Sequence, residues 1–103
     1  MEWNFELVAG PYGGTTEGPA WDGEALLFTF IPGSRLLRHD PRSGETTDFR
    51  RYTNRTNGLA FSADGQLYGC QSGSRRIVRF NADGSTSLLE YRLNGHFHNH
   101  PND

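Results

Sequence analysis

Three side chains with oxygen ligands stand at nearly regular intervals in the chain: Glu17, Asn57 and Asn102. Glu17 opens the run EGPAW at residues 17–21, and Asn57 opens the related run NGLAF at residues 57–61. Carboxylate and amide oxygens are the ligands that a hard divalent cation prefers, and Ca²⁺ accepts six to eight of them. Brought to one place, these three side chains would supply part of a cation site.

The two runs belong to a repeat of about forty residues. Gly33-Ser34-Arg35 matches Gly73-Ser74-Arg75 at an offset of 40, and Gly44 matches Gly84. Asp-Gly, Gly-Ser and Ser-Gly pairs divide each repeat at intervals of about ten residues, which favours short strands joined by tight turns. Strands are expected at residues 19–21, 26–31, 35–39 and 46–52, and again at 59–61, 66–71, 76–81 and 86–91.

Four short strands on a period near forty are typical of a β-propeller blade. A single blade cannot bury both faces of its sheet, so it must stack on its neighbours. The sequence therefore predicts an all-β chain with two four-stranded antiparallel blades of an incomplete propeller. The expected bounds are 17–52 for blade one, 57–92 for blade two, 101–103 for the start of blade three, and 5–8 for a strand of the closing blade. A small β-sandwich is the alternative, although it would not require the two halves to be related.

In a propeller the first strand of each blade lines the central channel, so Glu17, Asn57 and Asn102 are expected at one channel mouth. Asp103 is a further channel-facing candidate. Spacing alone leaves simpler interpretations open, because Asn57-Gly58 also suits a hairpin turn and Asn102-Asp103 an ordinary loop. The aromatic side chains expected between the blades are Trp21, Phe28, Phe61 and Tyr68.

Residues 17–21, 35–41, 57–59 and 100–103 together resemble the gluconolactonase/regucalcin family of sugar-lactone hydrolases. The resemblance implies a six-bladed propeller that holds one divalent cation, with Ca²⁺ expected first and Zn²⁺ or Mg²⁺ as alternatives. By this resemblance Glu17 is a metal ligand, and Asn102 contacts the substrate or a metal-bound water. His100 stands where the family often has arginine or serine, and it is a further candidate for substrate contact. The implied reaction is hydrolysis of a cyclic ester, in which the cation polarises the carbonyl and a carboxylate takes a proton from water.

The same resemblance places the remaining metal ligands and the general base in later blades. No catalytic residue is therefore expected within these 103 residues, and the chain is expected to be an N-terminal part that is inactive alone. The alternative is a non-catalytic half-propeller that assembles with copies of itself or binds a partner. A third interpretation is a propeller that uses its channel for another reaction, as strictosidine-synthase-like proteins do.

Alternating histidines at positions 96, 98 and 100 could share one face of a strand and bind zinc. The competing interpretation is a loop that enters a third blade, with one histidine near the substrate.

Composition excludes several partner classes. The net charge is -2, and the ten basic residues, all arginine, are spread between Arg35 and Arg92, so no nucleic-acid patch is expected. No apolar run approaches the length of a membrane span, and the N-terminus lacks the features of a signal peptide, which predicts a cytoplasmic protein. With Cys70 as its sole cysteine the chain forms no internal disulfide. A small sugar lactone remains the expected partner, together with self-association through uncovered blades.

Overall fold

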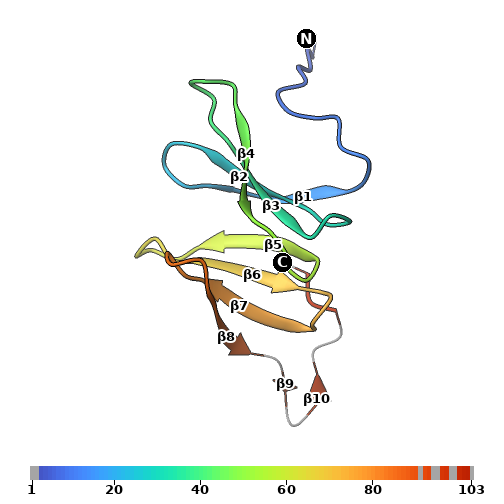
Figure 1. Ribbon diagram of the computed structural model, residues 1–103, viewed down its shortest axis with the longest axis vertical. Coiled ribbons are helices and arrows are strands. Elements are labelled where there is room, and N and C mark those ends of the chain that lie inside the picture. The colour runs from blue at the N-terminus through green and yellow to red at the C-terminus, as the bar shows by residue number, and fades with distance from the viewer. Residues whose placement is uncertain (1–2, 91, 94–95, 98–99, 103) are drawn as a thin grey trace.

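The computed structural model describes residues 3–90, 92–93, 96–97 and 100–102, and it confirms the all-β prediction. Two four-stranded antiparallel sheets follow one another in the chain, each with its strands in sequence order (Figure 1). The first contains β1 (Thr16–Trp21), β2 (Leu26–Phe30), β3 (Arg35–His39) and β4 (Thr46–Arg50). The second contains β5 (Thr56–Phe61), β6 (Leu67–Gln71), β7 (Arg76–Phe80) and β8 (Thr86–Glu90). A short antiparallel pair, β9 (Arg92–Leu93) and β10 (His96–Phe97), comes next.

The hairpin turns form where the Asp-Gly pairs predict them. In the β1–β2 turn the carboxylate Oδ1 of Asp22 accepts hydrogen bonds from the backbone N–H groups of Glu24 and Ala25, each at 2.8 Å. Gly23 between them has a φ of 107°, a value that favours glycine. Local sequence therefore specifies this reversal of the chain, and Arg38 of β3 supports it with a hydrogen bond from its Nε to Asp22 Oδ2 at 2.8 Å.

The structure corrects one detail of the repeat. The outer elements keep the expected offset of 40, since β1 starts at Thr16 and β5 at Thr56. The middle strands are offset by 41, because β3 starts at Arg35 and β7 at Arg76. The match between residues 33–35 and 73–75 is thus wrong by one position. The residue with positive φ before β3 is Ser34, and its counterpart before β7 is Arg75.

The hydrophobic core lies between the two sheets. Leu27 and Leu36 of the first sheet pack with three residues of the second sheet, and all five are at most 5% exposed. The three partners are Leu67, Val78 and Phe80. Because successive side chains of a strand point to opposite faces, each middle strand gives alternate residues to this core.

Two of the four predicted aromatic core positions depart clearly from expectation. Phe61 packs against the core as predicted. Trp21, however, is the last residue of β1 and is 55% exposed. Phe28 alternates with the core residue Leu27, so it lies on the other face, where its ring contacts that of Tyr12 at a centroid distance of 5.9 Å. Tyr68 alternates with Leu67 in the same way and is half-buried.

The two sheets stack as neighbouring blades of a propeller do, with β5 beside β1 and β2 (Figure 1). Residues 5–8 form no strand with the described part of the chain, and their side chains are exposed. Their assignment to a closing blade, and that of residues 101–103 to a third blade, stay predictions. Among the residues that the structure describes, no helix is long and apolar enough to cross a membrane.

Candidate functional site

The first strands of the two sheets come unusually close together at Gly18. A Cβ atom built on Gly18 would lie 2.0 Å from the backbone oxygen of Asn57, and the φ of Gly18 is 61°. A non-glycine residue would therefore clash with backbone and adopt a strained conformation at once. This glycine is what lets β1 approach β5 beside the two predicted site residues, Glu17 and Asn57.

A buried hydroxyl connects the same two positions. Thr29 has no exposed surface, and its Oγ1 lies 3.0 Å from the backbone oxygen of Glu17 and 3.0 Å from that of Asn57. The single hydroxyl proton is shared between the two carbonyl acceptors, since a threonine hydroxyl donates one hydrogen bond. Thr29 thereby fixes Glu17 and Asn57 at the same level of neighbouring strands.

Each first strand also carries an irregularity at this level. The pairing of β1 with β2 shifts register between Glu17 and Ala20, and that of β5 with β6 shifts between Thr56 and Leu59. A bulge of this kind redirects side chains and is common next to functional sites. Both blades thus repeat the same local distortion where the sequence repeats its Gly-containing run.

The side chain of Asn57 is buried and holds a distant segment. It is 5% exposed, and its Nδ2 donates a hydrogen bond to the backbone oxygen of Pro101 at 3.0 Å. Its Oδ1 accepts a hydrogen bond from the backbone N–H of Gly58. Both ends of the amide are therefore engaged within the protein. In this structure Asn57 joins β5 to residues 100–102, an arrangement that spacing did not reveal.

The segment 100–102 lies at the end of the sheets where Glu17 and Asn57 stand. His100 is exposed, has a φ of 49°, and its Nδ1 is 3.2 Å from the backbone oxygen of Ser72. Asn102 is exposed, next to the bonded Pro101. Asp103 lies outside the described residues. Figure 1 shows this segment beside the start of β5.

The described residues show no complete cation site. Within residues 3–90, 92–93, 96–97 and 100–102, no group of three or more His, Cys, Asp or Glu side chains is arranged to hold a metal ion. Glu17 and Asn102 carry oxygens of the kind that Ca²⁺ prefers, but its coordination sphere needs six to eight. The zinc hypothesis depends on His96 and His98, whose side chains lie outside the described residues, so it stays a prediction.

Sequence reasoning missed Thr29 and Gly18 as organising residues. Thr29 interrupts the apolar run of residues 26–31, and a hydroxyl within a strand that is expected to be buried signals a specific hydrogen bond. Gly18 gave the weaker signal of a glycine within a strand, which marks a bulge or a close approach of backbones.

Comparisons with solved structures identify the fold. A gluconolactonase from Xanthomonas campestris is 37% identical over 85% of this chain and 30% of its own, with a TM-score of 0.81. A structural-genomics target assigned to the gluconolactonases is 25% identical over 95% of this chain and 34% of its own, with a TM-score of 0.83. Virginiamycin B lyase from Staphylococcus aureus, 22% identical over 78% of this chain and 28% of its own, has a TM-score of 0.62 and shows the fold alone.

This chain thus spans about a third of the length of the gluconolactonase structures it matches. A comparison with curated protein sequences finds no match. The profile of the SMP-30/gluconolactonase/LRE-like region matches residues 15–103, which include both sheets and the segment around Asn102. The chain therefore belongs to the SMP-30/gluconolactonase/LRE-like family.

Proposed function

We propose that this chain forms the first part of the channel site of a divalent-cation-dependent sugar-lactone hydrolase. Family membership and the likeness to gluconolactonases support the substrate class. The proposal rests on two sets of hydrogen bonds that bring Glu17, Asn57 and the segment before Asn102 together. Thr29 Oγ1 joins the backbones of Glu17 and Asn57, and Asn57 Nδ2 joins β5 to Pro101, the neighbour of Asn102.

In this proposal Glu17 gives a carboxylate oxygen to the cation, with Ca²⁺ the first choice and Mg²⁺ or Zn²⁺ the alternatives. Asn102 offers an amide donor and acceptor to the hydroxyl groups of a sugar lactone, and exposed His100 lies beside it. A bound cation would supply Lewis-acid polarisation of the ester carbonyl. The carboxylate that takes a proton from water is proposed to come from later blades. The cytoplasmic location stays a prediction from sequence.

A chimera tests the role of Glu17 most directly. Residues 15–103 would replace the corresponding blades of the Xanthomonas gluconolactonase, whose remaining blades complete the ring. We expect calcium-dependent hydrolysis of gluconolactone by the chimera and a loss of at least about tenfold for Glu17→Gln, since mutation of even the outer-shell partners of a metal ligand costs about 10–100-fold. Glu24→Gln, at an exposed turn position, is the matched control. An active Glu17→Gln chimera would refute the assignment.

The chain by itself is expected to give no turnover, because among the described residues no group of three or more His, Cys, Asp or Glu side chains could hold a metal ion. A lactonase assay in calcium, magnesium or zinc buffer, with the Xanthomonas enzyme as positive control, measures this. Clear metal-dependent turnover by the 103 residues would contradict it.

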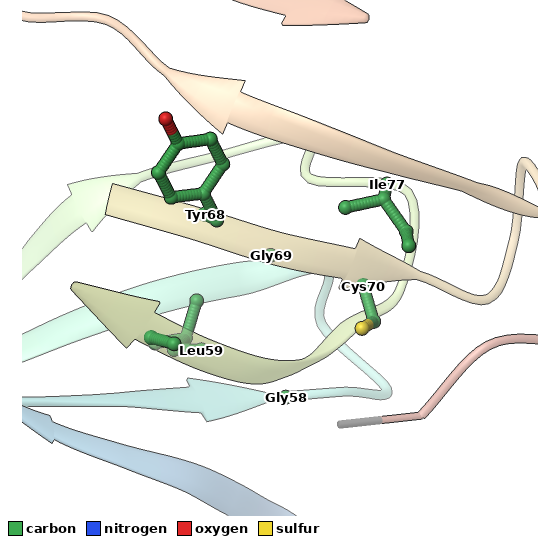
Figure 2. Close-up of a pocket in the computed structure, with 7 residues that line it drawn as sticks. Gly58, Leu59, Tyr68, Gly69, Cys70 and Ile77 are labelled. Atoms are coloured by element: carbon green, nitrogen blue, oxygen red, sulfur yellow. The ribbon is translucent and has the colours of Figure 1, made fainter. Parts of the chain in front are cut away.

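A second candidate function, self-association of a non-catalytic half-propeller, is supported by an apolar pocket of about 260 Å³ on the second sheet. Tyr68, Cys70 and Ile77 line it on the face turned away from the first sheet (Figure 2). A propeller blade buries such a face against its neighbour. Three copies of the chain would complete six blades. Light scattering distinguishes the candidates, since a discrete trimer favours self-association and a monomer opposes it.

A further inference from the structure

The two sheets contact each other through opposite faces. β2 and β6 are counterparts at an offset of 41, since Leu26 begins the one and Leu67 the other. Burial alternates along both strands in the opposite sense, because every second residue from 27 is buried in β2 and every second residue from 67 is buried in β6. The first sheet thus contributes its back face, defined by Leu27, Thr29 and Leu36. The second sheet contributes its front face, defined by Leu67, Val78 and Phe80.

The back face of the second sheet is a counterpart of the back face that is already buried. At the offset of 41, the three back-face residues of the first sheet correspond to Tyr68, Cys70 and Ile77. In the first sheet these positions have no exposed surface, because they lie against the second sheet. In the second sheet they are half-buried and line the apolar pocket of about 260 Å³ (Figure 2). The surface around Tyr68 therefore repeats one that receives a front face.

The front face of the first sheet is covered by the chain itself. Here β2 carries Phe28 and Phe30 at the positions where β6 has Gly69 and Gln71. The ring of Tyr12 contacts both phenylalanines, with centroid distances of 5.9 Å to Phe28 and 5.7 Å to Phe30. Tyr12 therefore lies against the first sheet on the side that, in the second sheet, lies against the first.

Residues 12–15, which we call the Tyr12 cap, are held by backbone hydrogen bonds. The N–H of Gly14 donates to the oxygen of Tyr12 at 2.9 Å, and the N–H of Ile31 donates to the oxygen of Thr15 at 3.1 Å. The second bond joins the cap to the residue that follows β2. Tyr12 and the two phenylalanines that it contacts are all half-buried. A second sheet that packs on these rings from the same side must displace Tyr12.

We propose that the front face of the first sheet is a docking surface for the back face of the second sheet of another copy, and that the Tyr12 cap blocks it. The occupant follows from the interface within the chain, since the surface around Tyr68 is the counterpart of one that already packs on a front face. Such a contact is head-to-tail, so it can join further copies. The cap competes as an intramolecular ligand with a high effective concentration.

In the unchanged chain the cap therefore opposes self-association. This inference uses the surface named for the self-association candidate and adds the surface that receives it and the segment that keeps the two apart. It shares no residue with the proposed lactonase site.

Sedimentation velocity over a range of protein concentrations, in a reducing buffer that keeps Cys70 as a thiol, tests the cap. We expect the unchanged chain to be monomeric. Tyr12→Ala should self-associate, with an association constant at least about tenfold above that of the unchanged chain, because two aromatic contacts that compete with docking are lost. Tyr12→Phe keeps the ring and should remain monomeric. Tyr52→Ala removes a tyrosine that is 89% exposed outside the cap, and this matched control should also remain monomeric.

A mixing experiment identifies the two faces. Tyr12→Ala/Ile77→Asp has an open front face and a charge on its back face, so it should be monomeric alone. The unchanged chain has a capped front face and an open back face. Mixed together, the two should form a complex with one copy of each. Tyr68→Asp in place of Ile77→Asp should behave alike, and a ¹H–¹⁵N NMR spectrum with dispersed signals verifies that each variant is folded.

Three results would overturn the proposal. A dimer or trimer of the unchanged chain would mean that the cap does not block docking, although a trimer would still favour the self-association candidate. A folded, monomeric Tyr12→Ala would mean that the front face is no docking surface. Association of Tyr12→Ala that neither Ile77→Asp nor Tyr68→Asp reduces would place the contact on another surface. None of these results bears on the Glu17→Gln chimera, so the lactonase proposal is tested separately.

Discussion

The side-chain amide of Asn57 donates a hydrogen bond to the backbone oxygen of Pro101 at 3.0 Å, across 44 positions of the chain. The first strand of the second sheet thereby holds the segment that follows that sheet. Because Asn102 is the next residue, the orientation of this proposed substrate contact depends on Asn57, whose amide is engaged at both ends within the protein.

Asn57→Ala should release residues 100–102. We expect faster hydrogen exchange at Asn102 and a loss of about 1–3 kcal/mol in the free energy of unfolding, because the mutation also leaves the N–H of Gly58 without its partner. Hydrogen-exchange mass spectrometry and urea unfolding measure the two effects. Asn4→Ala, at an exposed position, is the control. Unchanged exchange at Asn102 would show that the hydrogen bond does not hold the segment.

Gly18→Ala should separate β1 from β5. The added methyl group would lie 2.0 Å from the oxygen of Asn57 at a φ of 61°, so we expect a loss of at least about 2 kcal/mol in unfolding free energy. Gly13→Ala is the matched control, since a Cβ at Gly13 meets nothing within 4 Å. The two variants are compared by urea unfolding, and equal midpoints would contradict the close approach.

Thr29→Val should loosen the connection between Glu17 and Asn57 while filling the same volume. Two buried carbonyl groups lose their shared donor, which costs about 1–3 kcal/mol in unfolding free energy. Thr29→Ser keeps the hydroxyl and should recover most of the loss. Thr47→Val, at the exposed position of β4, is expected to be neutral within about 0.5 kcal/mol. Failure of serine to recover stability would mean that shape, and not the hydroxyl, matters at this position.

The first sheet should lose stability in acid through Asp22. Burial alone raises the pKa of this carboxyl, but hydrogen bonds from the Arg38 side chain and from the backbone N–H groups of Glu24 and Ala25 outweigh it and hold the pKa below 3.8. A carboxyl whose pKa is lower in the folded state stabilises that state above its unfolded pKa, and the contribution disappears as pH falls through the folded pKa.

The melting temperature should therefore decline as pH is lowered below about 4, near the unfolded pKa of aspartate. Asp22→Asn should be less stable than the unchanged chain at pH 7 and should lose less stability between pH 7 and pH 3. Asp64 is an exposed turn aspartate of the second sheet. Its pKa is lowered chiefly by the Ser62 hydroxyl and last by the charge of Arg79, so Asp64→Asn is the comparison in which arginine contributes least. Parallel pH profiles for Asp22→Asn and the unchanged chain would exclude the proposed role of Asp22.

Sequence predicted the strands well because their limits are set locally. Turns such as Asp22-Gly23 form from their own side chains and backbone, so the spacing of such pairs indicates where each strand begins and ends. The one-residue error near Gly73 arose because the identical residues Gly-Ser-Arg align at an offset of 40. In the structure the counterpart of Ser34 is Arg75, since each has a positive φ and directly precedes the third strand of its sheet.

The contacts of the candidate site were not predictable in the same way. Spacing indicated Glu17, Asn57 and Asn102, but the function of Thr29 depends on two carbonyl groups, one of them 28 positions away. Likewise, no local pattern says that Asn57 meets Pro101. The exposure of Trp21 had a similar cause, since its large apolar side chain favours burial and only the stacking of the two sheets decides how far the cover extends.

The offset of 41 in the middle strands has a consequence for recombining blades. One residue is gained between β5 and β6, where residues 62–66 replace the four of 22–25, and one is lost between β7 and β8, where residues 81–85 replace the six of 40–45. Both changes lie in turns at the end of the strands opposite Glu17. The β2–β3 and β6–β7 turns, at the Glu17 end, keep equal lengths. Insertions, affinity tags or peptide epitopes are therefore best accommodated in the turns at that opposite end. The turns at the Glu17 end have the same length in both blades, so they can be exchanged between blades without a change in length.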